Sequence, residues 1–136
     1  MCIRDRRIYT KYLTGSVTAG GEDTVLEVAG RGVIVFVNIS LAGAAADARN
    51  SRIVVESDGE TIEHVSPYDV FECQWGDFGK WSPKAFCHKW DDGAFVYSLC
   101  LELNHGFKQY AKVKIRNGDP ANATAYRCLV MYGLEV

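Results

Sequence analysis

Apolar and polar residues alternate along most of this chain, which is typical of strands with one face turned to a core. The strongest run, Val33–Leu41, is apolar on both faces in its first half and predicts a central strand. In Ala94–Leu103 the apolar positions from Phe95 to Leu103 share one face. Similar patterns predict strands at Lys11–Val17, Thr24–Ala29, Arg52–Ser57, Glu60–Val65, Tyr110–Arg116 and Thr124–Leu134.

Short turn signals separate these strands. Asp58-Gly59 is the strongest, because this pair favours the positive φ angles of a type I′ hairpin. Further turns are predicted at Ala19–Asp23, Asn104–Gly106 and Asn117–Pro120, and a loop at Ala42–Asn50. About seven or eight strands without a convincing helix predict an all-β fold, an antiparallel two-sheet β-sandwich that is jelly-roll-like. A single domain is expected over residues 7–136.

The connection Ser66–Tyr97 interrupts this regular spacing. It holds nine of the sixteen aromatic residues, all three tryptophans and two of the three prolines. Connections longer than about 12–15 residues in compact domains are usually functional or mobile. We therefore predict one long aromatic crossover loop. Its candidate binding or interface residues are Tyr68, Phe71, Trp75, Asp77, Phe78, Trp81, Trp90 and Asp92.

Three roles are open for these aromatic residues. The tryptophans can anchor a protein interface, where Trp and Tyr are favoured. They can instead stack on sugar rings, with Asp77, Lys80 or Asp92 bonded to the hydroxyls. The third role is structural, in which the segment folds back and closes one end of the sandwich.

Catalytic signatures are absent from the sequence. It has no P-loop, no GxSxG nucleophile elbow and no HExxH motif, and Gly30-Arg31-Gly32 lacks the third glycine of a dinucleotide site. Carboxylates that could form a glycosidase pair lie in the aromatic connection: Asp69, Glu72, Asp77, Asp91 and Asp92. Because Asp91-Asp92-Gly93 also reads as a turn and Asp69 as a cap, we expect no enzyme activity, no catalytic residue and no cofactor.

The cysteines form no CxxC pair, so no zinc or redox motif is indicated. Cys100 and Cys128 fall in strand patterns and are expected to be small buried side chains. Cys73 and Cys87 are favoured as unpaired thiols, although a disulfide between them, or a metal site with His88, stays open.

The net charge of the chain limits the classes of partner that it is expected to bind. A net charge of −2 argues against broad binding to nucleic acid or to a membrane surface. Lys108, Lys112, Lys114 and Arg116 lie close together but alternate with apolar residues, which predicts the solvent face of a strand. No apolar run approaches the roughly 20 residues of a membrane span, and no signal peptide is visible.

The first six residues, Met1–Arg6, match the translation of a transposase sequencing adapter, so they are expected to be an artefact of shotgun sequencing. The native N-terminus is then expected to be missing.

Five runs of the chain resemble a pattern in bacteriophage tail and other virion proteins: GRGVIVFVNIS, RIVVESDGETI, SPYDVF, AFVYSLCLELNHGFKQYAKVKIRNG and YRCLVMYGLEV. In that pattern a strand ending in Asp-Gly-Glu precedes an aromatic D-x-F loop and a final tyrosine-bearing strand. The same order is similar to one jelly roll of the difructose-anhydride-synthase type of glycosidase. The resemblance covers Gly30 to Val136.

The resemblance implies a non-enzymatic structural or attachment module of a phage particle, either tail-associated or capsid-associated. Such a module would be made in the host cytoplasm and would assemble through its aromatic loop with copies of itself or with other virion proteins. The alternative is a carbohydrate-binding module, or a fragment of a glycan-active enzyme, with a glycan ligand. A single short domain without a catalytic motif favours the virion module.

Overall fold

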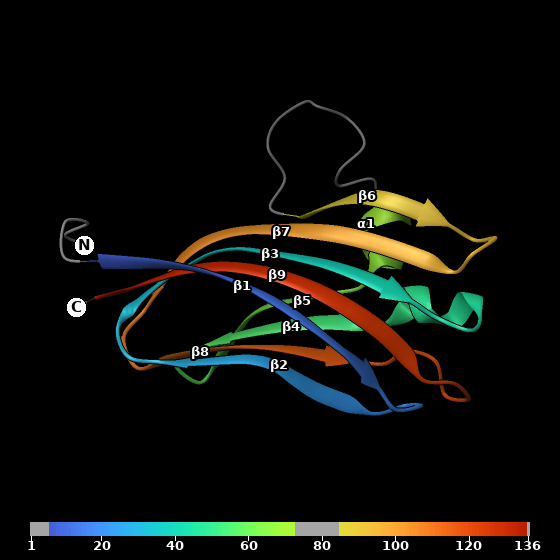
Figure 1. Cartoon of the computed structure of the whole chain (residues 1–136), viewed down its shortest axis with the longest axis horizontal. Helices are drawn as coiled ribbons and strands as arrows, with labels where there is room; N and C mark the ends of the chain where they lie inside the picture. Colours follow the sequence, from blue (N-terminus) through green and yellow to red (C-terminus); the bar gives the residue numbers. More distant parts are fainter. Residues whose placement is uncertain (1–5, 73–84, 136) are drawn as a thin grey trace.

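The computed structural model describes residues 6–72 and 85–135. They form nine strands and two short helices, arranged as two layers (Figure 1). The strands are β1 (Arg6–Val17), β2 (Glu22–Ala29), β3 (Gly32–Ala42), β4 (Arg52–Ser57), β5 (Glu60–Val65), β6 (Ala85–Asp91), β7 (Val96–Phe107), β8 (Tyr110–Arg116) and β9 (Thr124–Glu135). The helices are the 3-10 helix η1 (Ala46–Asn50) and α1 (Pro67–Glu72).

The two sheets have the strand order of a jelly roll. One sheet runs β1-β9-β3-β7-β6 and the other β2-β8-β4-β5, and every pairing is antiparallel. Apart from β6, consecutive strands change sheet at each connection except the β4–β5 hairpin. Two interleaved Greek keys produce this crossing pattern. The predicted all-β, jelly-roll-like sandwich is therefore confirmed, with β6 as an additional strand beside β7.

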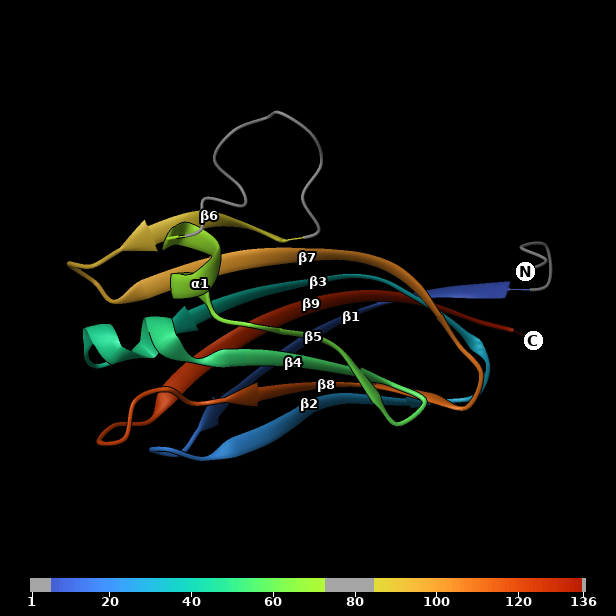
Figure 2. The same ribbon diagram turned by 180° about the vertical axis from the view of Figure 1, so that it is seen from behind.

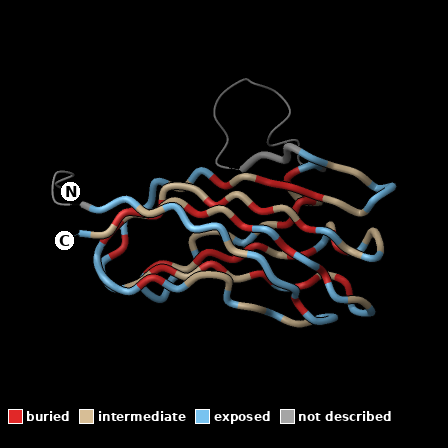
Figure 3. The backbone as a smooth tube through the Cα atoms, viewed as in Figure 1, coloured by how far each residue is buried: buried red, intermediate tan, exposed pale blue. Residues whose placement is uncertain are grey.

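The core lies between the two sheets, and buried residues recur between exposed or half-buried ones along most strands (Figure 3). The apolar face predicted for the strand after the aromatic segment is confirmed, because Tyr97, Leu99 and Leu101 have no exposed surface. Other fully buried side chains are Val37, Ile39 and Leu41 of β3, Ile53 and Val55 of β4, Val113 and Ile115 of β8, and Cys128 and Val130 of β9.

The Asp58-Gly59 turn forms as predicted. Both residues have positive φ angles, 52° and 87°, which a type I′ turn requires. The Asp58 carboxylate also accepts hydrogen bonds from the backbone N–H groups of Lys108, Gln109 and Tyr110, at 2.8, 2.7 and 3.1 Å. These bonds, led by the one from Lys108, lower the pKa of Asp58. One side chain thus joins the β4–β5 turn to the β7–β8 turn.

The predicted turn at Asn104–Gly106 is wrong. Strand β7 continues to Phe107, and the chain reverses at Lys108 and Gln109 instead. Asn104 does adopt a positive φ of 46°, but it lies where the β3–β7 register shifts between Ile34 and Phe36. Asparagine tolerates this conformation in a β-bulge as well as in a turn. Asn104 therefore marks a bulge within β7 and not the turn that the sequence predicts.

The aromatic connection is more ordered than a loop. Its described parts contain helix α1 and strand β6, both of which sequence periodicity missed. Each is short, at 6 and 7 residues, and gains its stability from packing rather than from local propensity. Helix η1 likewise replaces part of the loop predicted at Ala42–Asn50, with Ala48 fully buried.

The two lateral edges of the sandwich differ. At one edge β1 lies beside β2, and at the opposite edge helix α1 lies beside β6 and after the end of β5 (Figures 1 and 2). Val70 of α1 is only 2% exposed and belongs to the hydrophobic core. Helix α1 therefore closes the gap between the sheets at this edge.

Candidate functional site

Four of the predicted interface residues meet beside α1. Tyr68 and Phe71 come from α1, Trp90 from the end of β6, and Asp92 from the turn before β7. Two residues outside the prediction complete the group, Arg49 of η1 and Tyr97 of β7. We call these six residues the aromatic cluster.

Helix α1 is held in place by its first residues. The Ser66 hydroxyl accepts a hydrogen bond from the Asp69 N–H at 3.1 Å, and the Asp69 carboxylate accepts one from the Ser66 N–H at 3.4 Å. This reciprocal pair is a capping box, which satisfies backbone donors at a helix start. The same carboxylate forms an ion pair with Arg52 of β4, which joins α1 to the smaller sheet. The sequence-based interpretation of Asp69 as a cap is confirmed.

Trp90 is the centre of the aromatic cluster. Its indole ring is stacked on Phe71, with 4.2 Å between centroids and 9° between planes. Tyr97 meets it at an angle of 63° with centroids 4.8 Å apart, and Tyr68 lies 6.4 Å away. Offset-stacked and edge-to-face pairs each stabilise beyond their buried area. Phe71 therefore covers one face of the indole ring.

Asp92 accepts hydrogen bonds from two other members of the aromatic cluster. Its carboxylate accepts hydrogen bonds from the Tyr97 hydroxyl at 2.6 Å and from the Trp90 indole N–H at 3.1 Å. The bond from Tyr97 is the main reason that the pKa of Asp92 is lowered. Burial, together with the bond to Asp92, raises the pKa of Tyr97 to about 12. At neutral pH the pair is thus a phenol donating to a carboxylate.

Arg49 adds a cation to the aromatic cluster. Its guanidinium carbon lies 5.1 Å from the centroid of the Tyr68 ring and 5.8 Å from that of Trp90. It also forms an ion pair with Asp92 at 3.5 Å. Arginine over aromatic faces forms cation–π interactions. Sequence reasoning missed Arg49 because its segment was expected to be a loop with no known neighbour.

The described carboxylates of this region, Asp69, Asp91 and Asp92, form bonds that hold its structure. Asp91 accepts hydrogen bonds from the backbone N–H groups of Gly93 and Ala94, so it shapes the β6–β7 turn as predicted. Asp69 and Asp92 are likewise engaged in structural bonds. Within residues 6–72 and 85–135, no three His, Cys, Asp or Glu side chains gather as metal ligands.

The remaining predicted residues lie outside the described residues: Trp75, Asp77, Phe78 and Trp81. Cys73 lies there as well, so the unpaired state of Cys73 and Cys87 stays a prediction, with a disulfide between them as the alternative. Cys100 and Cys128 are free thiols in strands, and Cys128 is fully buried as predicted. Phe71 is the member of the aromatic cluster with a large exposed apolar surface, at 45%.

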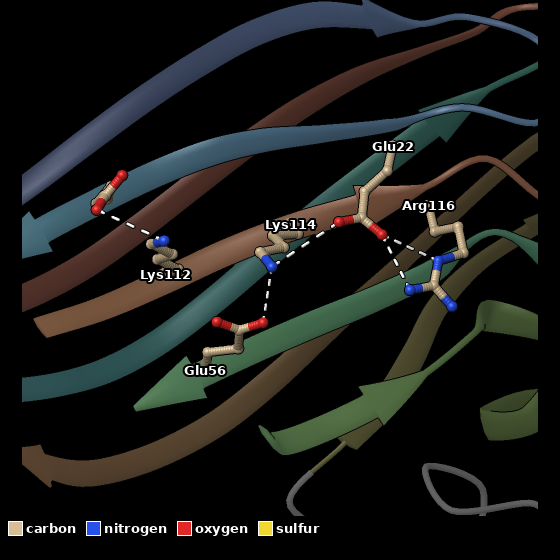
Figure 4. Close-up of polar contacts among 6 residues, drawn as sticks. Glu22, Glu56, Lys112, Lys114 and Arg116 are labelled. Atoms are coloured by element: carbon tan, nitrogen blue, oxygen red, sulfur yellow. Dashed lines mark hydrogen bonds and ion pairs between the residues drawn. The ribbon is translucent and has the colours of Figure 1, made fainter. Parts of the chain in front are cut away.

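The basic residues of β8 face solvent, as predicted, on the outer side of the smaller sheet (Figure 4). Lys114 forms ion pairs with Glu56 at 2.7 Å and with Glu22 at 3.8 Å. Arg116 pairs with Glu22 at 3.0 Å, and Lys112 with Glu27 at 3.7 Å. Each cation thus has an acidic neighbour, and this face is not an unpaired basic surface.

The outer face of the larger sheet carries a hollow of about 860 Å³. Its lining includes Tyr12 and Thr14 of β1, Ser40 of β3, Lys89 of β6 and Arg127 of β9. The hollow is separate from the aromatic cluster and combines hydroxyl groups with two cations. None of the helices in the described part of the chain is long and apolar enough to cross a bilayer.

No protein-family model and no curated protein matches the chain. Solved structures do match. A chain of the cyanophage Pam1 capsid asymmetric unit aligns over 98% of this chain and 89% of its own, with 10% identity and a TM-score of 0.50.

Two further matches have lower scores. A chain of the acid-stable capsid of Helicobacter pylori bacteriophage KHP30 aligns over 96% and 99% of the two chains, at 8% identity and a TM-score of 0.48. A chain of infectious bursal disease virus, Gx strain, aligns over 97% and 32%, at 10% identity and a TM-score of 0.40. At such identities the similarity to the Pam1 chain establishes a shared fold, and the chain is a single jelly roll of that kind.

Proposed function

We propose that this chain is a non-enzymatic structural module of a phage particle, associated with its capsid or tail. The observation that carries this proposal is the complete jelly roll, which aligns with nearly the whole of a phage capsid chain. An enzyme built on this fold would need a constellation of reactive groups. The described carboxylates near the aromatic cluster are instead bonded to backbone groups or to neighbouring side chains.

We propose that the module attaches through its aromatic segment. Helix α1 and strand β6 border residues 73–84 and are fixed to the sandwich by the aromatic cluster. Phe71 extends this rigid base to the surface. Aromatic residues are favoured as interface hot spots, and the aromatic segment offers Phe71, Trp75, Phe78 and Trp81 as candidate anchors.

The test is the protein content of purified particles. Particles of the source phage, banded by density and digested for quantitative mass spectrometry, are expected to contain this chain in a fixed ratio to the major shell protein. A chain found only in the lysate and never in banded particles would contradict the proposal.

The aromatic attachment has its own test. Phe71→Ala and Trp81→Ala are expected to lower incorporation of the chain into particles, whereas His105→Ala, at an exposed position of β7, serves as the control. Equal incorporation of all three variants would contradict attachment through the aromatic segment.

The hollow on the outer sheet face favours a second candidate function, the binding of a glycan. Tyr12, which is 62% exposed, lines the hollow together with hydroxyl groups and two cationic side chains. Rings and hydroxyls of this kind recognise sugars. A glycan array that shows binding lost in Tyr12→Ala would support this function, and silence across the array would remove it.

A further inference from the structure

A row of polar residues crosses the larger sheet from β1 to β6, at right angles to its strands. The strand register places these five residues opposite one another, and they are, in sheet order, Thr14, Arg127, Ser40, Ser98 and Lys89. All of them except Ser98 line the hollow on the outer face of this sheet. The Ser98 hydroxyl donates a hydrogen bond to Ser40 Oγ at 2.9 Å. The Ser40 hydroxyl can therefore donate in turn to a group in the hollow.

Short side chains make room beside this polar row. In the adjacent row of the register, Ala42 of β3 is paired with Ala125 of β9 and with Val96 of β7, and all three residues line the hollow. An alanine side chain ends at Cβ, so this row lies lower than the long side chains beside it. The exposed ring of Tyr12 on β1 also lines the hollow. The hollow thus combines hydroxyl groups, an aromatic ring and space.

The charged side chains that line the hollow are both cations, Arg127 and Lys89. Arg127 is exposed, and its guanidinium forms no ion pair or hydrogen bond within residues 6–72 and 85–135. The residues that line the hollow in this part of the chain include no carboxylate. A guanidinium beside a hollow without carboxylates favours a ligand that carries negative charge.

Two carboxylates lie next to residues of the hollow, and both are bonded within the fold. Asp91 is paired in the register with Val96, and its Oδ1 accepts hydrogen bonds from two backbone N–H groups of the β6–β7 turn. Asp23 accepts the hydrogen bond of the Tyr126 hydroxyl at 2.9 Å. Neither carboxylate lines the hollow itself or forms an ion pair with Arg127. The guanidinium therefore stays available to a ligand.

We propose that the hollow binds an acidic saccharide, with a carboxylate of the sugar on Arg127. This inference rests on the second candidate function, glycan binding, and names the class of glycan. The planar guanidinium presents paired N–H donors that match a carboxylate. Sugar hydroxyls suit the hydroxyl groups of Thr14 and Ser40, and a sugar ring suits the Tyr12 side chain. Lys89 lies three strands from Arg127 on the same row, about 14 Å between Cα atoms, which leaves room for one or two sugar units.

The test is calorimetric titration with three acidic oligosaccharides, each compared with its carboxyl methyl ester, which keeps the sugar and removes the charge. The acids are trigalacturonic acid, 3′-sialyllactose and a hyaluronan tetrasaccharide. At least one acid is expected to bind, with its ester roughly tenfold weaker or more. Arg127→Gln should weaken binding of that acid by a similar factor and leave the ester unchanged. Lys11→Gln, which removes an exposed cation of β1 outside the hollow, is the matched control and should bind as the wild type does. Thermal unfolding confirms that both variants fold.

Four results would overturn the acidic class of ligand. They are acids that do not bind, esters that bind as tightly as the acids, Arg127→Gln that binds the acids as the wild type does, and sodium sulfate that binds as tightly as the acids. Binding of the esters that is lost in Tyr12→Ala would overturn the acidic class alone and leave glycan binding standing. A wild-type protein that binds neither acids, esters nor the glycan array would remove both. The content of banded particles is measured separately, so none of these results bears on the virion proposal.

Discussion

The indole ring of Trp90 is stacked on the phenyl ring of Phe71, with 4.2 Å between the centroids and 9° between the planes. The two residues lie 19 positions apart, on either side of residues 73–84. Their contact joins helix α1 to strand β6, and Tyr97 and Asp92 continue it into β7. The stack of Trp90 on Phe71 therefore joins both described ends of the aromatic segment, α1 and β6, to the jelly roll.

Replacing Trp90 with alanine should destabilise the protein by about 2–3 kcal/mol, because the stack on Phe71 and the hydrogen bond to Asp92 are both lost. Urea unfolding measures this free energy. The matched control is Tyr12→Ala, since Tyr12 is 62% exposed and should change the free energy of unfolding by about 0.5 kcal/mol or less. Equal losses in the two variants would show that the stack contributes nothing.

Burial of the Tyr97 phenol, together with its hydrogen bond to Asp92, makes stability depend on alkaline pH. The folded pKa of Tyr97 is about 12, above its ordinary value of 10.0. Its contribution to the free energy of unfolding is therefore complete below pH 10 and is lost as the pH rises towards 12. Urea unfolding between pH 9 and 12 should show less pH dependence in Tyr97→Phe than in the wild type. Identical curves would contradict the shift.

The Asp92→Asn variant tests the hydrogen bond between Tyr97 and Asp92 from the acceptor side. Removal of the carboxylate charge should lower the pKa of Tyr97, which NMR of tyrosine labelled at the phenolic carbon follows directly. Tyr126, whose pKa is also raised to about 12 by burial and by its bond to Asp23, is the internal control and should not move.

Asn117 should be among the most sensitive polar positions. It is 4% exposed, and its amide donates to the carbonyl oxygens of Val17, Thr18 and Asn122. Asn117→Ala leaves buried groups without partners and should cost about 2–3 kcal/mol in urea unfolding. Asn50→Ala, at an exposed site of η1, should change stability by about 0.5 kcal/mol or less. A small effect at Asn117 would mean that water replaces its bonds.

Gly32→Ala should destabilise the sandwich through backbone crowding. A Cβ atom at Gly32 would lie 1.9 Å from the carbonyl oxygen of Gly133 in β9, so the two central strands would have to separate. We expect a loss of about 3 kcal/mol or failure to fold. Gly93→Ala, where the nearest atom is a side-chain oxygen of Asp91 at 3.3 Å, should be tolerated. Thermal unfolding of both variants makes the comparison.

Cys128 should resist alkylation in the folded protein. It is fully buried, and burial raises its pKa to about 12, so almost no thiolate forms at pH 8. Peptide-level mass spectrometry after iodoacetamide treatment should show Cys128 modified only with denaturant. Cys100 is partly exposed and should react sooner than Cys128. Rapid modification of Cys128 in native buffer would contradict this burial.

The sequence by itself determined most of the sandwich. Alternation of apolar residues located the strands from Val33–Leu41 to Thr124–Leu134, because a face buried against a core must repeat every second residue. The Asp58-Gly59 turn was also predictable, since its positive φ angles are a local requirement. The cap formed by Ser66 and Asp69 belongs to the same class of local signals.

Tertiary packing decided the rest. Helix α1, helix η1 and strand β6 are too short to show a period, and contacts with distant residues stabilise them. The positive φ of Asn104 serves a bulge rather than a turn, because the partner strand β3 shifts its register opposite it. Arg49 and Tyr97 join Trp90 only in space. Composition showed that aromatic residues gather in one segment, but only the fold decided which of them touch, because contact depends on distances that no local pattern encodes.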